Sequence, residues 1–224
     1  MPSRTIWRTA PAAAALLLSG LTLAGCARSA ATLTEADRAL AAATGIPEPL
    51  LLTIKQSGGS LRRLEGRDEE DPLREAAGVT IDVAGARALP AVRRLQEAAG
   101  PGFRVFLSER QYGIGGAADQ VSVLRTTDPF DPLRAVGTNG ANYDIGTDAV
   151  IERLKKWDAE FGLDLHGAGF DWVDGTFRRP PADMPGFARE VFEFCPDVVE
   201  QGTGTVEALA DEMRKSNTLY LWWD

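Results

Sequence analysis

Residues 79–107, VTIDVAGARALPAVRRLQEAAGPGFRVFL, decide the fold of this chain. Apolar and polar side chains alternate over residues 79–83, which predicts a half-buried strand. Residues 86–99 follow with a helical pattern, which Gly100 and the proline and glycine after it bring to an end. A second strand is expected over residues 103–107, so the whole stretch predicts a β-α-β unit. The apolar face of the helix comprises Leu89, Val92 and Leu95.

The sequence on both sides of this unit predicts further strands and helices. Residues 163–168 and 170–178 are expected to form a hairpin, with a bulge at Asp174 and the glycine after it. Both faces of the last strand, residues 219–223, are apolar, and we therefore expect it at the centre of the sheet. Residues 50–55 fit either a helix or a strand. The remaining elements are a strand over 120–124, a turn over 128–132 into a short helix that ends near Gly137, and helices over 34–45, 147–162 (capped by Thr147), 183–195 and 205–216.

These elements predict one α+β domain, in which a mixed β-sheet of five to six strands is packed by four to five helices. The chain divides into four expected segments. They are a signal peptide over residues 1–25, a tether and short helix over 26–45, the β-α-β part over 46–118, and a carboxy-terminal part over 119–224.

The chain is acidic, and its composition excludes several classes of function. Its 224 residues carry a formal net charge of −8 at pH 7. An acidic surface repels phosphate backbones, and we expect no nucleic-acid partner. A single histidine, His166, argues against HExxH motifs and zinc sites that need two imidazoles. We predict no metal site and no cofactor, and we assign no residue as catalytic.

Near the N-terminus, an apolar run over residues 12–23 ends in Leu23-Ala24-Gly25-Cys26 and is preceded by two arginines. This arrangement resembles the lipobox of bacterial lipoprotein signal peptides, in which the cysteine sulfur takes a diacylglyceryl group before cleavage. The resemblance implies lipidation of Cys26, a membrane anchor of acyl chains such as palmitate, and a place in the bacterial cell envelope. The same resemblance implies that Ala27 after the cysteine favours the outer membrane over the inner membrane. The alternative is an ordinary secretory signal with a chance Gly-Cys pair.

The carboxy-terminal half, from about Asp119 onward, carries four distinctive stretches. They are LRAVGTNGANYDI (133–145), GFDWV (169–173), FCPDVVEQGTGTV (194–206) and LYLWWD (219–224). Together they resemble the DUF4253 domain, a bacterial family of unknown function. The resemblance implies a fold and a set of family-typical positions, but no reaction. Many members look like cytoplasmic proteins, so a lipobox ahead of the domain is a departure from the family.

The loop over residues 137–144 is the first candidate binding site. Two glycines allow close backbone approach, and amide and carboxylate side chains converge there ahead of a helix. The alternative is a structural loop whose side chains satisfy its own backbone. Residues 201–205 are a second candidate anion site, or a glycine-rich turn with a threonine cap. The candidate binding residues are Asn139, Asn142, Tyr143, Asp144, Asp171, Trp172, Asp197 and Gln201.

Acidic side chains and one thiol offer enzymatic alternatives. Asp171 and Asp224 adjoin tryptophans, and apolar surroundings raise the pKa of a carboxylic acid, which suits acid–base hydrolysis. Cys195 falls on the apolar stripe of its helix, which favours a buried, inert thiol. A nucleophilic thiol needs a base, and His166 shares a strand face with Asp164, so a Cys-His-Asp arrangement stays open.

From these observations we expect a binding or interaction module in the cell envelope, with a protective role as one version of it. Its partners are the membrane, through the N-terminal lipid, and a protein or small molecule that the sequence does not identify. The alternative is a carboxylate-dependent hydrolase that acts on cell-envelope material through Asp171 and neighbouring acidic side chains.

Overall fold

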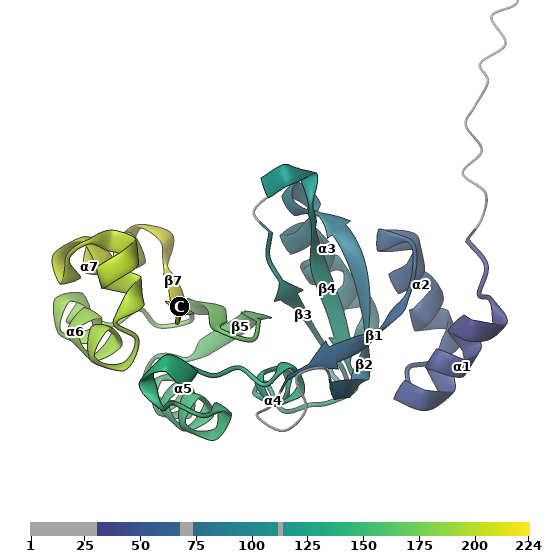
Figure 1. The fold of residues 1–224 in the computed structure, drawn as a ribbon, viewed down its shortest axis with the longest axis horizontal. Helices are drawn as coiled ribbons and strands as arrows, with labels where there is room; N and C mark the ends of the chain where they lie inside the picture. The colour runs from purple at the N-terminus through teal and green to yellow at the C-terminus, as the bar shows by residue number, and fades with distance from the viewer. Residues whose placement is uncertain (1–30, 68–73, 112–113) are drawn as a thin grey trace, which may run out of the picture. The chain divides into compact units, whose positions relative to one another are not determined.

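The computed structural model describes residues 31–67, 74–111 and 114–224, which belong to one compact unit. The predicted signal peptide, Cys26 and the first part of the predicted tether lie outside the described residues. The elements, shown in Figure 1, are α1 (Glu35–Thr44), α2 (Glu48–Gly58), β1 (Arg62–Gly66), β2 (Arg74–Ala84), α3 (Gly85–Ala99), β3 (Arg104–Glu109), the short 3₁₀ turn η1 (Ile114–Gly116), β4 (Ala118–Leu124), α4 (Asp131–Val136), the 3₁₀ turn η2 (Ala141–Tyr143), α5 (Thr147–Phe161), β5 (Leu163–Ala168), β6 (Trp172–Phe177), α6 (Met184–Phe194), the π-helical turn η3 (Val198–Thr203), α7 (Val206–Ser216) and β7 (Thr218–Trp222).

The expected α+β class with a mixed sheet is confirmed, but the expected numbers of strands and helices are too small. Over the described residues the sheet has seven strands, in the order β1-β2-β4-β3-β5-β6-β7, and seven α-helices surround it. The strand that the sequence did not predict is β1, a charged edge strand in which only Leu64 and Gly66 are buried. Alternation of apolar residues is too weak there to indicate a strand. Residues 50–55, left open by the sequence, belong to the helix α2.

The sheet consists of two antiparallel halves that meet at one short parallel junction. β1, β2, β4 and β3 pair antiparallel, and so do β5, β6 and β7. Between the halves, β3 and β5 run parallel and share a single paired position, Leu107 opposite Gly167. Both strands are irregular at this point, because the register shifts between Leu107 and Glu109 in β3 and between Leu165 and Gly167 in β5.

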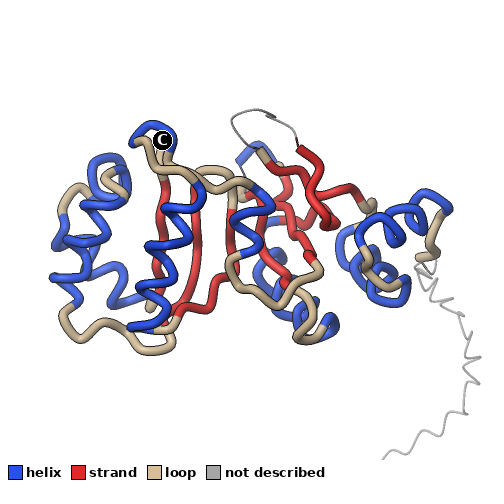
Figure 2. The backbone as a smooth tube through the Cα atoms, turned by 90° about the horizontal axis from the view of Figure 1, so that it is seen from below, coloured by secondary structure: helices blue, strands red, loops and turns tan. Residues whose placement is uncertain are grey.

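Two apolar cores lie on opposite faces of the sheet. On one face, α1, α2 and α3 pack against β2, β4 and β3, with Leu51, Leu95 and Val121 at full burial. On the other face, α5, α6 and α7 enclose a core around Trp157 with β5, β6 and β7, whereas α4 packs mainly against β1, β2 and β3. Figure 2 shows the strands running between these two sets of helices. Burial of this much apolar surface is the main stabilising contribution to the fold.

The last strand, β7, lies at an edge of the sheet, so its expected central position is wrong. Its two faces are indeed apolar: Leu219 and Leu221 are fully buried on one face, and Tyr220 and Trp222 pack against the other core. Burial of both faces therefore did not require a strand on both sides. The thiol of Cys195 covers part of the outer edge, because it donates to the Trp222 carbonyl at 3.0 Å and accepts from the Trp222 amide at 3.2 Å.

Local signals at helix ends agree with the structure in most places. Thr34 and Asp37 form the reciprocal capping box of α1, and the side chain of Asp183 caps α6. The expected cap of α5 is wrong, because Gly146 occupies the N-cap position and Thr147 is the first helical residue. Among the described residues, no helix combines the length and the apolar character needed to cross a bilayer.

Candidate functional site

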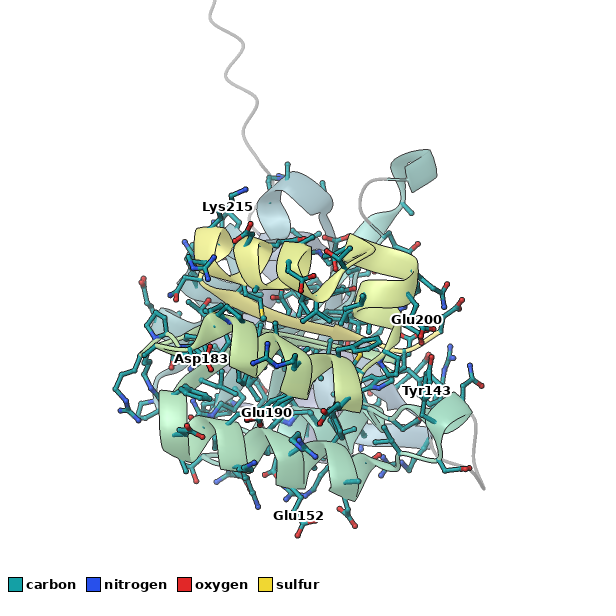
Figure 3. The ribbon with its side chains drawn as sticks, turned by 90° about the vertical axis from the view of Figure 1, so that its left-hand side faces the viewer. Tyr143, Glu152, Asp183, Glu190, Glu200 and Lys215 are labelled. Carbon is teal, nitrogen blue, oxygen red and sulfur yellow. The ribbon has the colours of Figure 1, made fainter. Side chains whose placement is uncertain are left out.

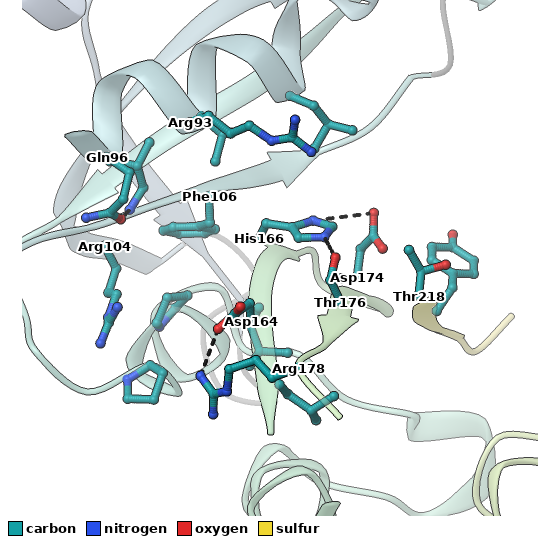
Figure 4. A pocket seen from close by; sticks show the side chains of 18 of the residues that line it. Arg93, Gln96, Arg104, Phe106, Asp164, His166, Asp174, Thr176, Arg178 and Thr218 are labelled. Carbon is teal, nitrogen blue, oxygen red and sulfur yellow. Dashed lines mark hydrogen bonds and ion pairs between the residues drawn. The ribbon is translucent and has the colours of Figure 1, made fainter. Parts of the chain in front are cut away.

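A groove of about 1160 Å³ lies beside the junction between the two halves of the sheet. Its floor comes from β5, β6 and β7, and one wall comes from α3 and the start of β3. Figure 4 shows Arg93 and Gln96 reaching from this wall, with His166, Asp174 and Thr176 on the floor. None of these five residues was predicted from the sequence to bind a ligand, and only His166 was considered, as the base of a Cys-His-Asp arrangement.

His166 stands at the centre of a polar network in this groove. It is the extra residue of the β5 bulge, since Leu165 lies opposite Gly175 and Gly167 lies opposite Asp174. A bulge turns a side chain away from the regular alternation of a strand. The Nε2 atom of His166 lies 3.1 Å from the hydroxyl oxygen of Thr176, and Nδ1 lies 3.7 Å from a carboxylate oxygen of Asp174. The bulge expected at Asp174 and Gly175 is thus centred on the opposite strand.

Asp174 is the buried carboxylate of this network and lies next to His166 and Arg110. It is 6% exposed, and burial raises the pKa of its carboxyl group, while the charges of His166 and Arg110 oppose that rise. Arg110 donates to a carboxylate oxygen of Asp174 at 3.1 Å. The buried carboxylate of Asp174 is thus held between a guanidinium and an imidazole.

The wall of the groove carries cationic groups with spare donors. No hydrogen bond or ion pair joins Arg93 to any other described residue, and its side chain is exposed on α3. Arg104 donates from Nη2 to the Thr127 carbonyl at 2.7 Å, whereas its buried Nε makes no hydrogen bond within the described part of the chain. The groove therefore offers donors to an anionic group at the side of β3.

Asp171 lies in a second, smaller cavity of about 340 Å³, together with Glu109 and Arg67. Burial raises the pKa of Asp171, and the nearby charge of Asp224 adds to the rise. Burial likewise raises the pKa of Glu109, and the charge of Asp171 adds to it. The Arg67 charge lowers both values. This cavity therefore holds two carboxylic acids with raised pKa values beside the Arg67 cation, and Glu65 also lines it.

The loop over residues 137–144 packs tightly against the chain around that cavity. Gly137 has a φ of 78°, and a Cβ added there would lie 1.8 Å from the Arg67 carbonyl oxygen, so only glycine fits. The side chain of Asn139 bonds its own loop, donating to the Gly137 carbonyl at 2.9 Å and accepting from the Ala141 amide at 3.0 Å. These contacts match the alternative of a self-satisfied structural loop.

Four of the predicted site residues meet around the carboxy-terminal residue. Asp197, 2% exposed, accepts from the Tyr143 hydroxyl at 2.7 Å, from the Gln201 amide at 2.9 Å and from the Asp224 backbone amide at 2.9 Å. Asn142 donates to the Asp224 carbonyl. We call Asn142, Tyr143, Asp197, Gln201 and Asp224 the C-terminal clamp. Figure 3 shows Tyr143 on the same side of the molecule as Glu200 of η3.

The charges of the clamp support one another. Burial alone would raise the pKa of Asp197, but the hydrogen bonds from Asp224, Tyr143 and Gln201 outweigh it and hold the pKa below its ordinary value. The hydrogen bond to Asp197 raises the pKa of Tyr143 to about 12. The clamp therefore fixes the end of the chain and the η2 turn through one buried carboxylate.

The other predicted site residues lie apart from the clamp. Asp144 is exposed with a φ of 56° and ends the η2 turn. Trp172 is buried in the same apolar core as α3 and stacks on Tyr220 at 6.5 Å between ring centroids. The eight residues therefore do not line one concavity, and neither the groove nor the smaller cavity contains a clamp residue.

Cys195 and His166 do not form a catalytic pair. The sulfur of Cys195 bonds the backbone of Trp222, whereas His166 contacts Thr176 and Asp174 in the groove. Burial raises the pKa of the Cys195 thiol to about 12. A thiol of this kind is not a nucleophile at neutral pH. Over the described part of the chain, no group of three or more histidine, cysteine or acidic side chains is close enough to hold a metal ion.

The groove escaped sequence analysis because its residues come from segments far apart in the chain. A lone histidine on a strand gave the only local signal, and the bulge that turns it into the groove depends on pairing with β6. Arg93, Gln96 and Arg104 sit on elements that the sequence predicted correctly, yet their shared location depends on the parallel contact between β3 and β5.

Comparison with curated proteins and with solved structures finds no match. One family model does match, over residues 120–224, and it describes a domain of unknown function, DUF4253. The matched segment contains β5, β6, β7 and the helices from α4 to α7, together with nearly all of β4. It includes the floor of the groove and the whole C-terminal clamp. Residues 120–224 therefore match the DUF4253 family model, as their four distinctive stretches predicted.

Proposed function

We propose that this chain is a lipid-anchored binding protein of the bacterial cell envelope, which holds its ligand in the groove beside β5, β6 and β7. The lipobox ending at Cys26 supports the anchor and the location, with the outer membrane favoured over the inner membrane. The acidic charge of the chain argues against a nucleic-acid ligand.

The observation that carries this proposal is the set of polar side chains that line the groove. Arg93 and the Nε of Arg104 have donors to spare, and Thr176 and His166 present polar groups from the floor. A concave site with a few convergent polar groups is the usual form of a binding site for a small molecule or a short segment. A ligand with an anionic group and further hydrogen-bonding groups fits this lining best.

The test is a thermal-shift and calorimetric screen of the detergent-solubilised full chain against amino acids, short peptides and peptidoglycan fragments. We expect a hit whose affinity falls at least ten-fold in Arg93→Gln and in Thr176→Val. Arg189→Gln, which removes an exposed arginine from α6, is the matched control and should bind normally. A hit that binds both groove variants with native affinity would contradict the groove as the site, and a panel without hits would contradict the proposed ligand class.

A second candidate function is hydrolysis of envelope material by the two carboxylic acids of the smaller cavity. The supporting observation is that Glu109 and Asp171 share the cavity and that burial raises the pKa of each. Such a pair can divide the roles of general acid and general base. Asp171→Asn and Glu109→Gln should each fold normally and abolish cleavage of a peptidoglycan and glycan panel. Absence of cleavage by the native chain would remove this candidate.

A further inference from the structure

The edge of β3 that faces the groove is a strand edge covered by a side chain. The amide nitrogen of Gln96 donates to the Phe103 carbonyl at 2.9 Å, and its amide oxygen accepts from the Val105 backbone amide at 2.9 Å. One donor and one acceptor are what a neighbouring strand would supply at this place. Gln96 therefore substitutes for a missing strand along the first part of β3.

The edge of β5 that faces the same groove is covered in a similar way. Phe177 in β6 donates its amide to the Asn217 carbonyl, so its backbone points away from β5. Leu163, directly opposite Phe177, must then point its backbone groups away from β6. A carboxylate oxygen of Asp158 accepts the Leu163 amide at 2.6 Å. Two side chains thus cover the backbone edges on the two sides of the groove.

The groove is the space left where the two halves of the sheet diverge. β3 and β5 are paired only at Leu107 and Gly167, and the groove is lined by earlier residues of both strands, Arg104–Phe106 and Leu163–His166. Its volume of about 1160 Å³ is large enough for several residues in extended conformation. The groove therefore combines a strand edge with room beside it.

We infer that the ligand of this groove is an extended, acidic peptide segment that adds as a short strand to the edge of β3 and displaces the Gln96 amide. This inference rests on the groove being the binding site and names its ligand class. Main-chain hydrogen bonds to a strand edge give a peptide its affinity, and the lining side chains give it specificity. Val105 offers both its amide and its carbonyl on this edge, because the two groups of a strand residue point the same way.

The unused cationic donors beside the edge favour an acidic segment. Arg93 lies above the edge on α3, and the buried Nε of Arg104 makes no hydrogen bond within the described residues. A carboxylate of the peptide can accept from either guanidinium. A lipid acyl chain would leave Arg104 Nε and His166 Nδ1, both buried, without partners, which is costly.

The groove is also lined by carboxylates, but Asp158 and Asp164 are paired with Arg178, and Asp174 is paired with Arg110. Of the acidic side chains in the lining, only the exposed Glu97 and Glu212 have no such partner among the described residues.

The experiment is a titration of the detergent-solubilised full chain with a mixed library of five-residue peptides, built from valine, threonine, serine, aspartate and lysine, with free or amidated carboxyl ends. Bound peptides should be enriched in aspartate or in free carboxyl ends. Comparison of the free with the amidated peptides distinguishes recognition of a side-chain carboxylate from recognition of the terminal one. Nuclear magnetic resonance should show shifts of the Val105 backbone amide and of the Gln96 side-chain amide.

Backbone N-methylation of a selected peptide tests strand addition without changing the protein. Methylation at alternate residues should weaken binding at least ten-fold in one register and leave it unchanged in the other, because successive amides of a strand point to opposite sides. Equal binding in both registers would overturn the inference.

The protein variant Gln96→Ala gives the complementary result. It removes the group that competes for the β3 edge, so we expect about five-fold tighter peptide binding. Gln201→Ala, a glutamine of the C-terminal clamp, should not change the affinity. Weaker binding by Gln96→Ala than by the native chain would overturn the inference.

A groove that binds a small molecule in an Arg93-dependent way but no peptide would overturn the inference and leave the proposed function standing. A groove that binds neither would overturn both.

Discussion

Replacement of Asp197 by alanine should destabilise the chain by about 3 kcal/mol, because this one carboxylate holds the C-terminal clamp together. The side chain accepts three hydrogen bonds, from Tyr143 at 2.7 Å, Gln201 at 2.9 Å and the Asp224 amide at 2.9 Å. A hydrogen bond to a charged group contributes about 1.5–3 kcal/mol. Tyr143 and Gln201 are exposed, so water replaces much of what those two donors lose. Most of the loss of about 3 kcal/mol therefore comes from the hydrogen bond to the Asp224 backbone amide, which fixes the end of the chain.

Urea denaturation followed by tryptophan fluorescence measures this loss directly. A loss of about 3 kcal/mol corresponds to a fall in the melting temperature of about 6–12 °C for a chain of this size. Glu200→Ala is the matched control, since it removes an exposed carboxylate three residues away. We expect the control to lie within about 0.5 kcal/mol of the native chain. If Asp197→Ala were as stable as Glu200→Ala, the clamp would not be a stabilising network.

Two further predictions follow from the structure, and a third follows from the lipobox in the sequence. The native chain should resist iodoacetamide at Cys195 at pH 8, since burial raises its pKa to about 12, and guanidinium should make it reactive; rapid labelling of the native chain, read by mass spectrometry, would contradict its edge-covering role. The pKa of Asp197 in the folded chain lies below its ordinary value of 3.8. Its stabilising contribution should therefore be present above about pH 4 and be lost as the pH falls through the pKa of the folded state. The urea midpoints of the native and Asp197→Asn chains should then converge, and a constant difference between them down to pH 2 would refute this. Cys26→Ser should move the chain from the detergent phase to the aqueous phase in detergent partitioning, and continued partition into detergent would exclude a lipid at that sulfur.

Helix ends were predictable because their signals are local. The capping pair Thr34 and Asp37, the cap of Asp183 and the turn at Gly137 all lie within a few residues of the element they limit. The strands of the β-α-β unit and of the β5–β6 hairpin were likewise evident from alternation. The cap of α5 was assigned one residue too late, a displacement that local patterns often cause.

The position of a strand within the sheet was not predictable from its own residues. β7 has two apolar faces yet forms an edge, because Cys195 covers part of its outer backbone from a helix end 27 residues away in sequence. β1 escaped notice because most of its side chains are charged or exposed. In each case the deciding contact is made by a segment distant in sequence.

Part of the candidate site was likewise predictable from the sequence, and part was not. Sequence proximity brought attention to the loop over residues 137–144, and the structure joins Asn142 and Tyr143 of that loop to Asp197, Gln201 and the chain end. The groove depends instead on the parallel junction at Leu107 and Gly167 and on the bulge at His166. Neither feature leaves a pattern in the sequence, because both arise from pairing between distant strands.

The most direct test of the groove as ligand site is a methyl-resolved nuclear magnetic resonance titration of the full chain with the five-residue peptide library. We expect chemical-shift changes of the methyl groups of Leu89, Val92 and Val105, which line the groove. The methyl groups of Val136 and Val150, which lie on the other face, should not shift. Shifts that gather around Val136, beside the cavity of Asp171, or that appear at no groove methyl, would contradict it.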